Sequence, residues 1–207
     1  LVHSVGGEPS WVFPLVTAVL LNRFSSKIHQ RILVFVLFTM LMDHVSTQSL
    51  LKNTFHDSTN SPWYHLGTPF LFFLMSVFYW DVLFVGRYRR LRWLLPLSFL
   101  LIATLSALRT EAFYRFPSIS VSIYSLTGIS LAIAYLLHEL QGKKVEEPTK
   151  KPIFWTSAGF LVYYTGSILV WTGLNFLNQH YFLFNSVYQV IGFTTLFLNL
   201  SFTVAIY

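Results

Sequence analysis

Seven long apolar stretches, separated by short clusters of charged residues and proline, constrain this chain more than any other feature of its sequence. About 20 apolar residues in a helix cross a bilayer, because each residue advances the helix by about 1.5 Å. Hydrophobic residues make up 54% of the 207 residues and charged residues 11%, whereas soluble domains carry about 25% charged residues. The pattern predicts an all-α, polytopic membrane protein with one domain, residues 1–207. The seven predicted transmembrane helices span residues 9–22, 32–51, 63–86, 93–108, 118–140, 153–176 and 181–207.

The basic residues lie mainly in alternate loops of this predicted bundle. Eleven of the 14 lysines and arginines fall in the loops after the first, third and fifth helices. They are Arg23, Lys27, Arg31, Arg87, Arg89, Arg90, Arg92, Lys143, Lys144, Lys150 and Lys151. By the positive-inside rule these loops are cytoplasmic, which places the amino terminus outside and the carboxyl terminus in the cytoplasm. Topology, together with contacts to membrane lipid, therefore accounts for the formal charge of +6, and we expect no nucleic-acid partner.

Asp43 and His44 interrupt the apolar pattern of the second helix. An ionisable side chain within a membrane span costs roughly 2.5–3.5 kcal/mol on insertion scales, so such residues are functional candidates. Adjacent helical residues point about 100° apart, and Asp43 shares a face with Thr39 and Thr47, so we expect Asp43 to be the inward one. A charged Asp43 paired with histidine, a protonated Asp43 bonded to Gln189, and a purely structural interhelical hydrogen bond are the alternatives.

Small and polar residues form stripes along the last three helices. The seventh helix carries Asn185, Gln189 and Asn199 on one face, and the fifth and sixth carry mostly serine, glycine and tyrosine. Small residues allow close packing of membrane helices, whereas asparagine and glutamine need polar partners in hydrocarbon. Counting residues from the helix ends places several of these groups near the depth of Asp43. The predicted ligand-binding residues are Asp43, His44, His65, Ser125, Ser167, Asn185 and Gln189.

The motifs of several enzyme and receptor families are missing from the sequence. Every lysine lies in a predicted loop, which excludes a retinal Schiff base, and no nucleotide-binding, serine-hydrolase or zinc-peptidase motif occurs. No spacing of histidine and acidic residues supports a metal site. We therefore expect no catalytic residue, no metal and no cofactor, and an enzyme is the less favoured class. Asp81 is expected to pair with a basic loop residue, and Glu139 to be solvated at the interface.

The last part of the sequence resembles one family of membrane proteins. The segments "KKPIFWTSAGFLVYYTGSILVW" and "FNSVYQVIGFTTLFLNLSFTVAIY", with "YLLHEL" before them, resemble the last three helices of a poorly characterised family of bacterial seven-helix membrane proteins. Some members resemble the membrane sensor regions of histidine kinases. The resemblance implies a sensory role in signal transduction at the bacterial inner membrane, without a catalytic residue.

The leading hypothesis is a receptor-like sensory module that binds a small or lipophilic ligand in an outer-half pocket and signals through the seventh helix to a cytoplasmic partner or domain. One alternative is a structural or accessory subunit of a larger membrane complex, with protein partner subunits. The other is a small-solute or proton-coupled transporter, which requires a water path to Asp43 from both sides.

Overall fold

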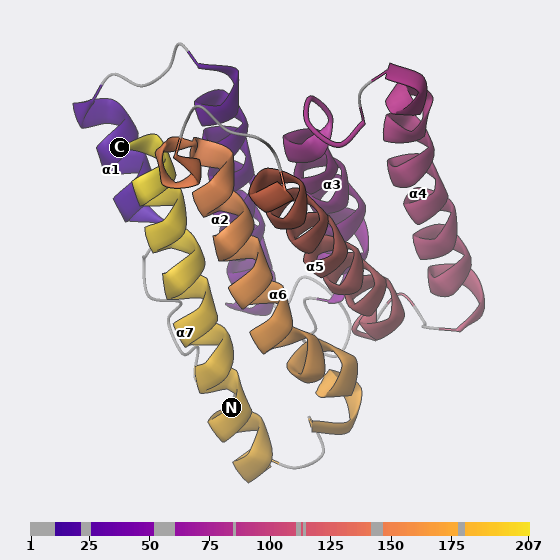
Figure 1. Ribbon diagram of the computed structural model, residues 1–207. Coiled ribbons are helices and arrows are strands. Elements are labelled where there is room, and N and C mark those ends of the chain that lie inside the picture. Colours follow the sequence, from indigo (N-terminus) through magenta and orange to yellow (C-terminus); the bar gives the residue numbers. More distant parts are fainter. Residues whose placement is uncertain are drawn as a thin grey trace.

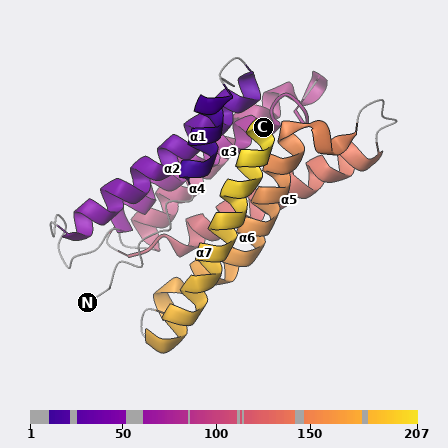
Figure 2. The ribbon, with the colours of Figure 1, turned by 90° about the vertical axis from the view of Figure 1, so that its left-hand side faces the viewer.

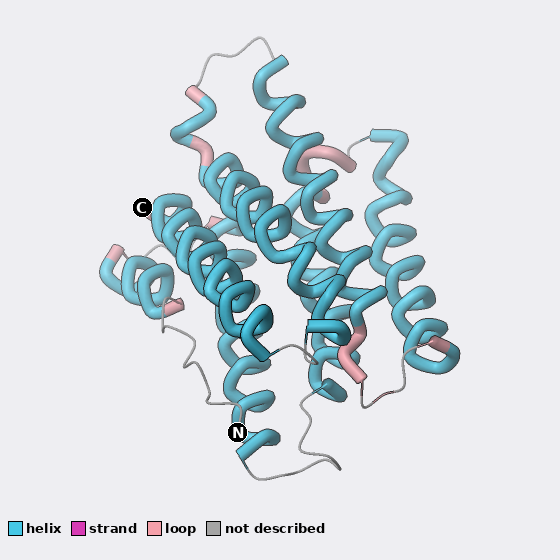
Figure 3. Tube along the Cα trace, turned by 90° about the horizontal axis from the view of Figure 1, so that it is seen from below, coloured by secondary structure: helices cyan, strands magenta, loops and turns pink. Residues whose placement is uncertain are grey.

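The computed structural model describes residues 11–21, 26–51, 61–84, 86–110, 113, 115–141, 147–177 and 181–207. Within these ranges the chain forms helices and loops and no strand (Figure 3), as the apolar pattern predicts. The α-helices are α1 Val12–Leu20, α2 Lys27–Leu51, α3 Ser61–Tyr79, α4 Leu91–Arg109, α5 Ser118–Gln141, α6 Pro152–Leu177 and α7 Tyr181–Ile206. Two 3₁₀ helices, η2 Gly86–Arg90 and η3 Pro148–Lys150, precede α4 and α6.

Five stretches of the described chain are helical, long and apolar enough to cross a membrane. They are Lys27–Ser46, Tyr88–Arg109, Ser118–Gln141, Pro152–Thr172 and Gln189–Ile206. This is the composition of an integral membrane protein. The described part of α1 has nine residues, and α3 begins with the polar sequence SPWYH, so neither is among the five. The seven predicted helices are all present, but a count of seven membrane spans stays a prediction.

Two predicted boundaries differ from the observed ones for local reasons. The third helix ends at Tyr79 rather than residue 86, and a turn over residues 80–84 leads into η2. The second helix begins at Lys27, five residues earlier than predicted. The first turns of this helix contain the polar residues Lys27, Gln30 and Arg31. A prediction from hydropathy begins the helix only where its apolar part begins.

Helices α5, α6 and α7 lie side by side in chain order, and α4 lies at the edge of the bundle beside α3 and α5 (Figure 1). Small residues set the closest approach of α6 and α7. A Cβ atom added at Gly159 would lie 2.8 Å from Ser201 Cβ, and one added at Gly166 would clash with Thr194. The predicted small-residue stripe of the sixth helix is therefore a packing surface.

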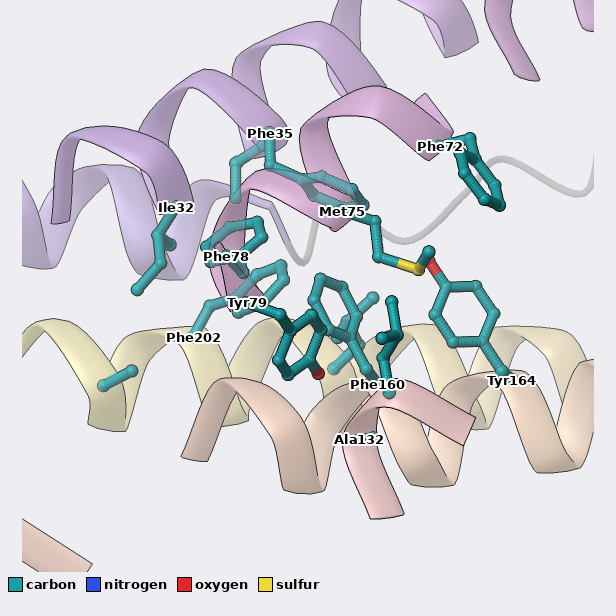
Figure 4. Packing of buried hydrophobic residues seen from close by; sticks show 14 of the residues in the cluster. Ile32, Phe35, Phe72, Met75, Phe78, Tyr79, Ala132, Phe160, Tyr164 and Phe202 are labelled. Carbon is teal, nitrogen blue, oxygen red and sulfur yellow. The ribbon is translucent and has the colours of Figure 1, made fainter. Parts of the chain in front are cut away.

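Four phenylalanines join the two halves of the bundle. Phe35 of α2 contacts Phe78 of α3, Phe160 of α6 and Phe202 of α7, with ring centroids 5.4–6.0 Å apart and edge-to-face geometry (Figure 4). Such ring pairs contribute roughly 0.5–1.5 kcal/mol each beyond the area they bury. We call these four residues the aromatic cluster, and all four are buried.

The aromatic cluster lies near one end of the bundle, which we call the basic end. Phe35 and Phe160 are each the ninth residue of their helix, and Phe78 and Phe202 precede the ends of α3 and α7 by one and four residues. The same end carries the first residues of α2, α4 and α6 and the last residues of α3, α5 and α7 (Figure 1). The described basic residues of the three predicted cytoplasmic loops are therefore gathered at one end. These residues are Lys27, Arg31, Arg87, Arg89, Arg90, Arg92, Lys150 and Lys151.

Candidate functional site

The face of α2 that carries Val36 changes from buried to exposed along the helix. Val36 is 2% exposed, whereas Asp43 is exposed. The two residues lie on the same face of α2, because seven residues turn a helix through almost two full turns. Thr39, between them, is partly buried and donates its hydroxyl proton to Phe35 O at 2.9 Å. The predicted inward face of the second helix is thus covered at the basic end and uncovered at Asp43.

Helix α7 shows the same transition. Phe202 is buried against Phe35, and Asn199 is 7% exposed. Thr195 is partly buried, Gly192 is exposed with no atom within 4 Å of the position a Cβ would take, and Gln189 is exposed. The polar stripe predicted for the seventh helix therefore begins in the core and runs out onto an open surface.

The cause is the arrangement of the helices. Helices α2 and α7 meet at the aromatic cluster and diverge towards the opposite end of the bundle (Figure 2). We call the surfaces formed by Thr39 and Asp43 of α2 and by Gln189, Gly192 and Thr195 of α7 the divergent faces; their burial decreases away from the aromatic cluster. They carry a carboxylate, an amide and two hydroxyls within or directly beside helices of membrane-spanning length. Ionisable side chains within membrane spans are rare, and they usually face the bundle interior or a water-filled cavity.

His44 and His65 do not share one face with Asp43. His44 is exposed about 100° around α2 from Asp43. His65 of α3 has its Nε2 2.9 Å from Arg115 O, and its ring stacks on Phe113 with centroids 5.4 Å apart. These contacts fix the start of α3 to the segment before α5, so His65 has a structural role in this conformation.

The two predicted serines lie inside the bundle. Ser125 and Ser167 are 1% and 0% exposed, and Ser167 donates to Tyr163 O at 2.6 Å. Beside them the Tyr164 hydroxyl donates to the Tyr124 hydroxyl, which links α6 to α5. This is helix packing rather than an open surface. Asn185 belongs to α7, but its side chain lies outside the described part of the chain.

Two ion pairs at the basic end bear on the sequence predictions. Arg31 Nη2 lies 2.6 Å from Asp81 Oδ2, so Asp81 pairs with a basic residue as predicted, across α2 and the turn after α3. Lys151 Nζ lies 2.9 Å from Glu139 Oε1, and the Glu139 side chain is only 7% exposed. The expectation that Glu139 is solvated was wrong.

A sequence signal for the buried glutamate existed. The small-residue stripe of α5 continues from Ser125 through Gly128, Ala132 and Tyr135 to Glu139 at spacings of three and four, so Glu139 falls on the buried face. Tyr135 packs against Tyr79, with ring centroids 6.3 Å apart, and the Tyr79 hydroxyl donates to Ser157 Oγ at 3.3 Å. The basic end therefore holds a packed polar layer behind the aromatic cluster.

Among the described residues no group of three or more histidine, aspartate or glutamate side chains could hold a metal ion. In comparisons with protein-family models, with curated proteins and with solved structures, the chain matches none. The resemblance to bacterial seven-helix sensor proteins thus stays a prediction.

Proposed function

We propose that this chain is a receptor-like sensory module of a bacterial inner membrane, with the divergent faces as its ligand-binding surface. The observation that carries the proposal is the transition along α2 from buried Val36 to exposed Asp43, matched on α7 between Asn199 and Gly192. The positive-inside rule puts the basic end in the cytoplasm, so the divergent faces open towards the outside.

The chemistry of the divergent faces defines the ligand class. Asp43 offers a carboxylate, Gln189 an amide and Thr195 a hydroxyl, and the neighbouring Leu41 and Phe193 are large exposed apolar side chains. A small or lipophilic molecule with a hydrogen-bond donor or a cationic group meets both requirements. It would enter from the outer leaflet or the outside solution.

A ligand that contacts both helices favours packings in which α2 and α7 lie closer together. Such a shift changes the angle between the helices at the aromatic cluster, and α7 continues from there to the cytoplasmic end. Signalling is then a population shift between two helix packings, in proportion to the ligand's difference in affinity for them.

The exposure of Asp43 also fits the accessory-subunit alternative. In that case a helix of a partner protein, rather than a ligand, packs against the carboxylate. A row of exposed leucines on α4 adds further apolar surface for a partner. This row is Leu94, Leu97, Leu101, Leu105 and Leu108. The transporter alternative requires the aromatic cluster to open, because that cluster closes the basic half of the bundle in this conformation.

The test is the structure of the native assembly, extracted in mild detergent without added ligand. Small-molecule density between α2 and α7 that is lost in Asp43→Asn supports the receptor. A protein helix packed there supports the accessory subunit and overturns the receptor. Gln141→Asn is the matched control, because Gln141 is an exposed polar residue at the basic end and belongs to neither α2 nor α7.

A further inference from the structure

A second surface, separate from the divergent faces, lies between α2 and α3 at the basic end. It is an open cleft of about 280 Å³. Its lining residues are Lys27, Gln30, Arg31, Val34, Leu74 and Val77. The polar residues come from the first turns of α2 and the apolar ones from the following turn of α2 and the end of α3. The cleft is therefore divided into a cationic part and an apolar part.

The order of these parts follows the helix axis. From Lys27 to Val34 helix α2 advances roughly 10 Å, from the basic end into the apolar part of the bundle. On α3, Leu74 and Val77 lie within the last six residues of the helix. A phospholipid in the adjoining leaflet has the same order, with its phosphate at the interface and its acyl chains inward.

Among the described residues, the two basic side chains of the cleft have one acidic partner, Asp81. Lys27 is exposed at the rim, and Arg31 shares one of its nitrogens with Asp81 at 2.6 Å. A guanidinium has five N–H donors, so the ion pair with Asp81 leaves others that can meet phosphate oxygens. Lys27, Arg31 and Asp81 together carry one net positive charge. One lipid with one net negative charge complements it, whereas a zwitterionic lipid does not.

We propose that this cleft binds one anionic phospholipid, with its phosphate on Lys27 and Arg31 and an acyl chain along Val34, Leu74 and Val77. Basic pockets between membrane helices on the cytoplasmic side are the expected place for such recognition. The proposal rests on the membrane insertion and orientation given above, but not on a ligand at the divergent faces. The bound lipid bridges α2 and α3 at the end where these helices are already joined by Phe35 and Phe78.

The test is native mass spectrometry of the purified protein with phosphatidylglycerol or phosphatidylcholine added at equal concentration. We expect one phosphatidylglycerol adduct in preference to phosphatidylcholine. Lys27→Gln should weaken that adduct about fivefold, the factor for one basic residue near an anionic surface. Lys150→Gln is the control, because it removes the same charge from an exposed residue at the same end but outside the cleft.

A second variant tests the apolar part independently of charge. Val77→Trp fills the cleft and should abolish the adduct, while circular dichroism shows the fold is kept. Equal binding of both lipids, equal loss in Lys27→Gln and Lys150→Gln, or displacement of the lipid by millimolar inorganic phosphate overturns the proposal. Asp43→Asn should leave the adduct unchanged, so failure here and failure of the receptor proposal are distinguishable.

Discussion

The two ends of this bundle are built from different interactions. At the basic end, four helices meet through the aromatic cluster, and two ion pairs join α2 to the turn after α3 and α5 to Lys151, the residue before α6. At the opposite end α2 and α7 diverge and expose Asp43, Gln189 and Gly192 (Figure 2). The difference teaches that close contacts between α2, α3, α6 and α7 at one end of a bundle can coexist with exposed polar groups on α2 and α7 towards the other end.

The largest effect is expected at the aromatic cluster. Phe160→Ala removes a ring that contacts Phe35, Phe78 and Phe202, and should lower the free energy of unfolding in detergent by roughly 3 kcal/mol. This is the lower end of the range for soluble cores, because lipid or detergent solvates the unfolded side chain. Phe193→Ala, on the exposed surface of α7, is the control and should change stability little. Equal losses would remove the distinction between the two ends.

Breaking the buried ion pair should have an effect of about the same size. Lys151→Met removes the cation beside the buried Glu139 carboxylate and should cost about 3 kcal/mol, near the lower bound for breaking a buried pair because Lys151 is partly exposed. Replacing both residues, as Glu139→Leu with Lys151→Met, should recover most of the loss. A double variant as unstable as the single one would show that the pair itself contributes the stability. Thermal unfolding followed by circular dichroism measures all three.

Two glycines, Gly166 of α6 and Gly192 of α7, allow a packed position to be compared with an open one. Gly166→Leu on α6 would collide with Thr194 of α7 and should cost roughly 2 kcal/mol, as overpacking does. Gly192→Leu on α7 meets no atom and should be neutral or slightly stabilising, because glycine is a poor helix former. Denaturation in increasing SDS is a suitable measurement. A large loss in Gly192→Leu would mean that the divergent faces close in the membrane.

The exposed ion pair should have the smallest effect. Asp81 has 63% of its side chain exposed, so Asp81→Asn should lower stability by only about 0.5 kcal/mol despite the 2.6 Å contact with Arg31. High salt should weaken the wild-type protein by a similar amount and leave Asp81→Asn unchanged. A loss as large as that of Lys151→Met would show that this pair is shielded from solvent in the membrane.

Part of the candidate site could be predicted from the sequence. The face shared by Thr39 and Asp43 follows from helical periodicity, and so does the polar stripe of the seventh helix. The grouping of Asp43 with Ser125 and Ser167 at one depth, and with His65 nearer the outer end, does not follow from periodicity, because residues at similar depth can lie on different sides of a bundle. In the structure His65 contacts the segment before α5, and Ser125 and Ser167 are buried between helices.

The sequence by itself determined the all-helical class, the seven helices and the gathering of basic loops at one end, because hydropathy and loop charge act locally along the chain. Only the tertiary structure decided which helices touch and where they diverge. Gly159 and Gly166 make α6 and α7 a close pair, and the aromatic cluster joins α2 to them at the basic end. The burial of Val36 and Glu139 and the exposure of Asp43 result from that arrangement, since burial depends on neighbours that are distant in the sequence.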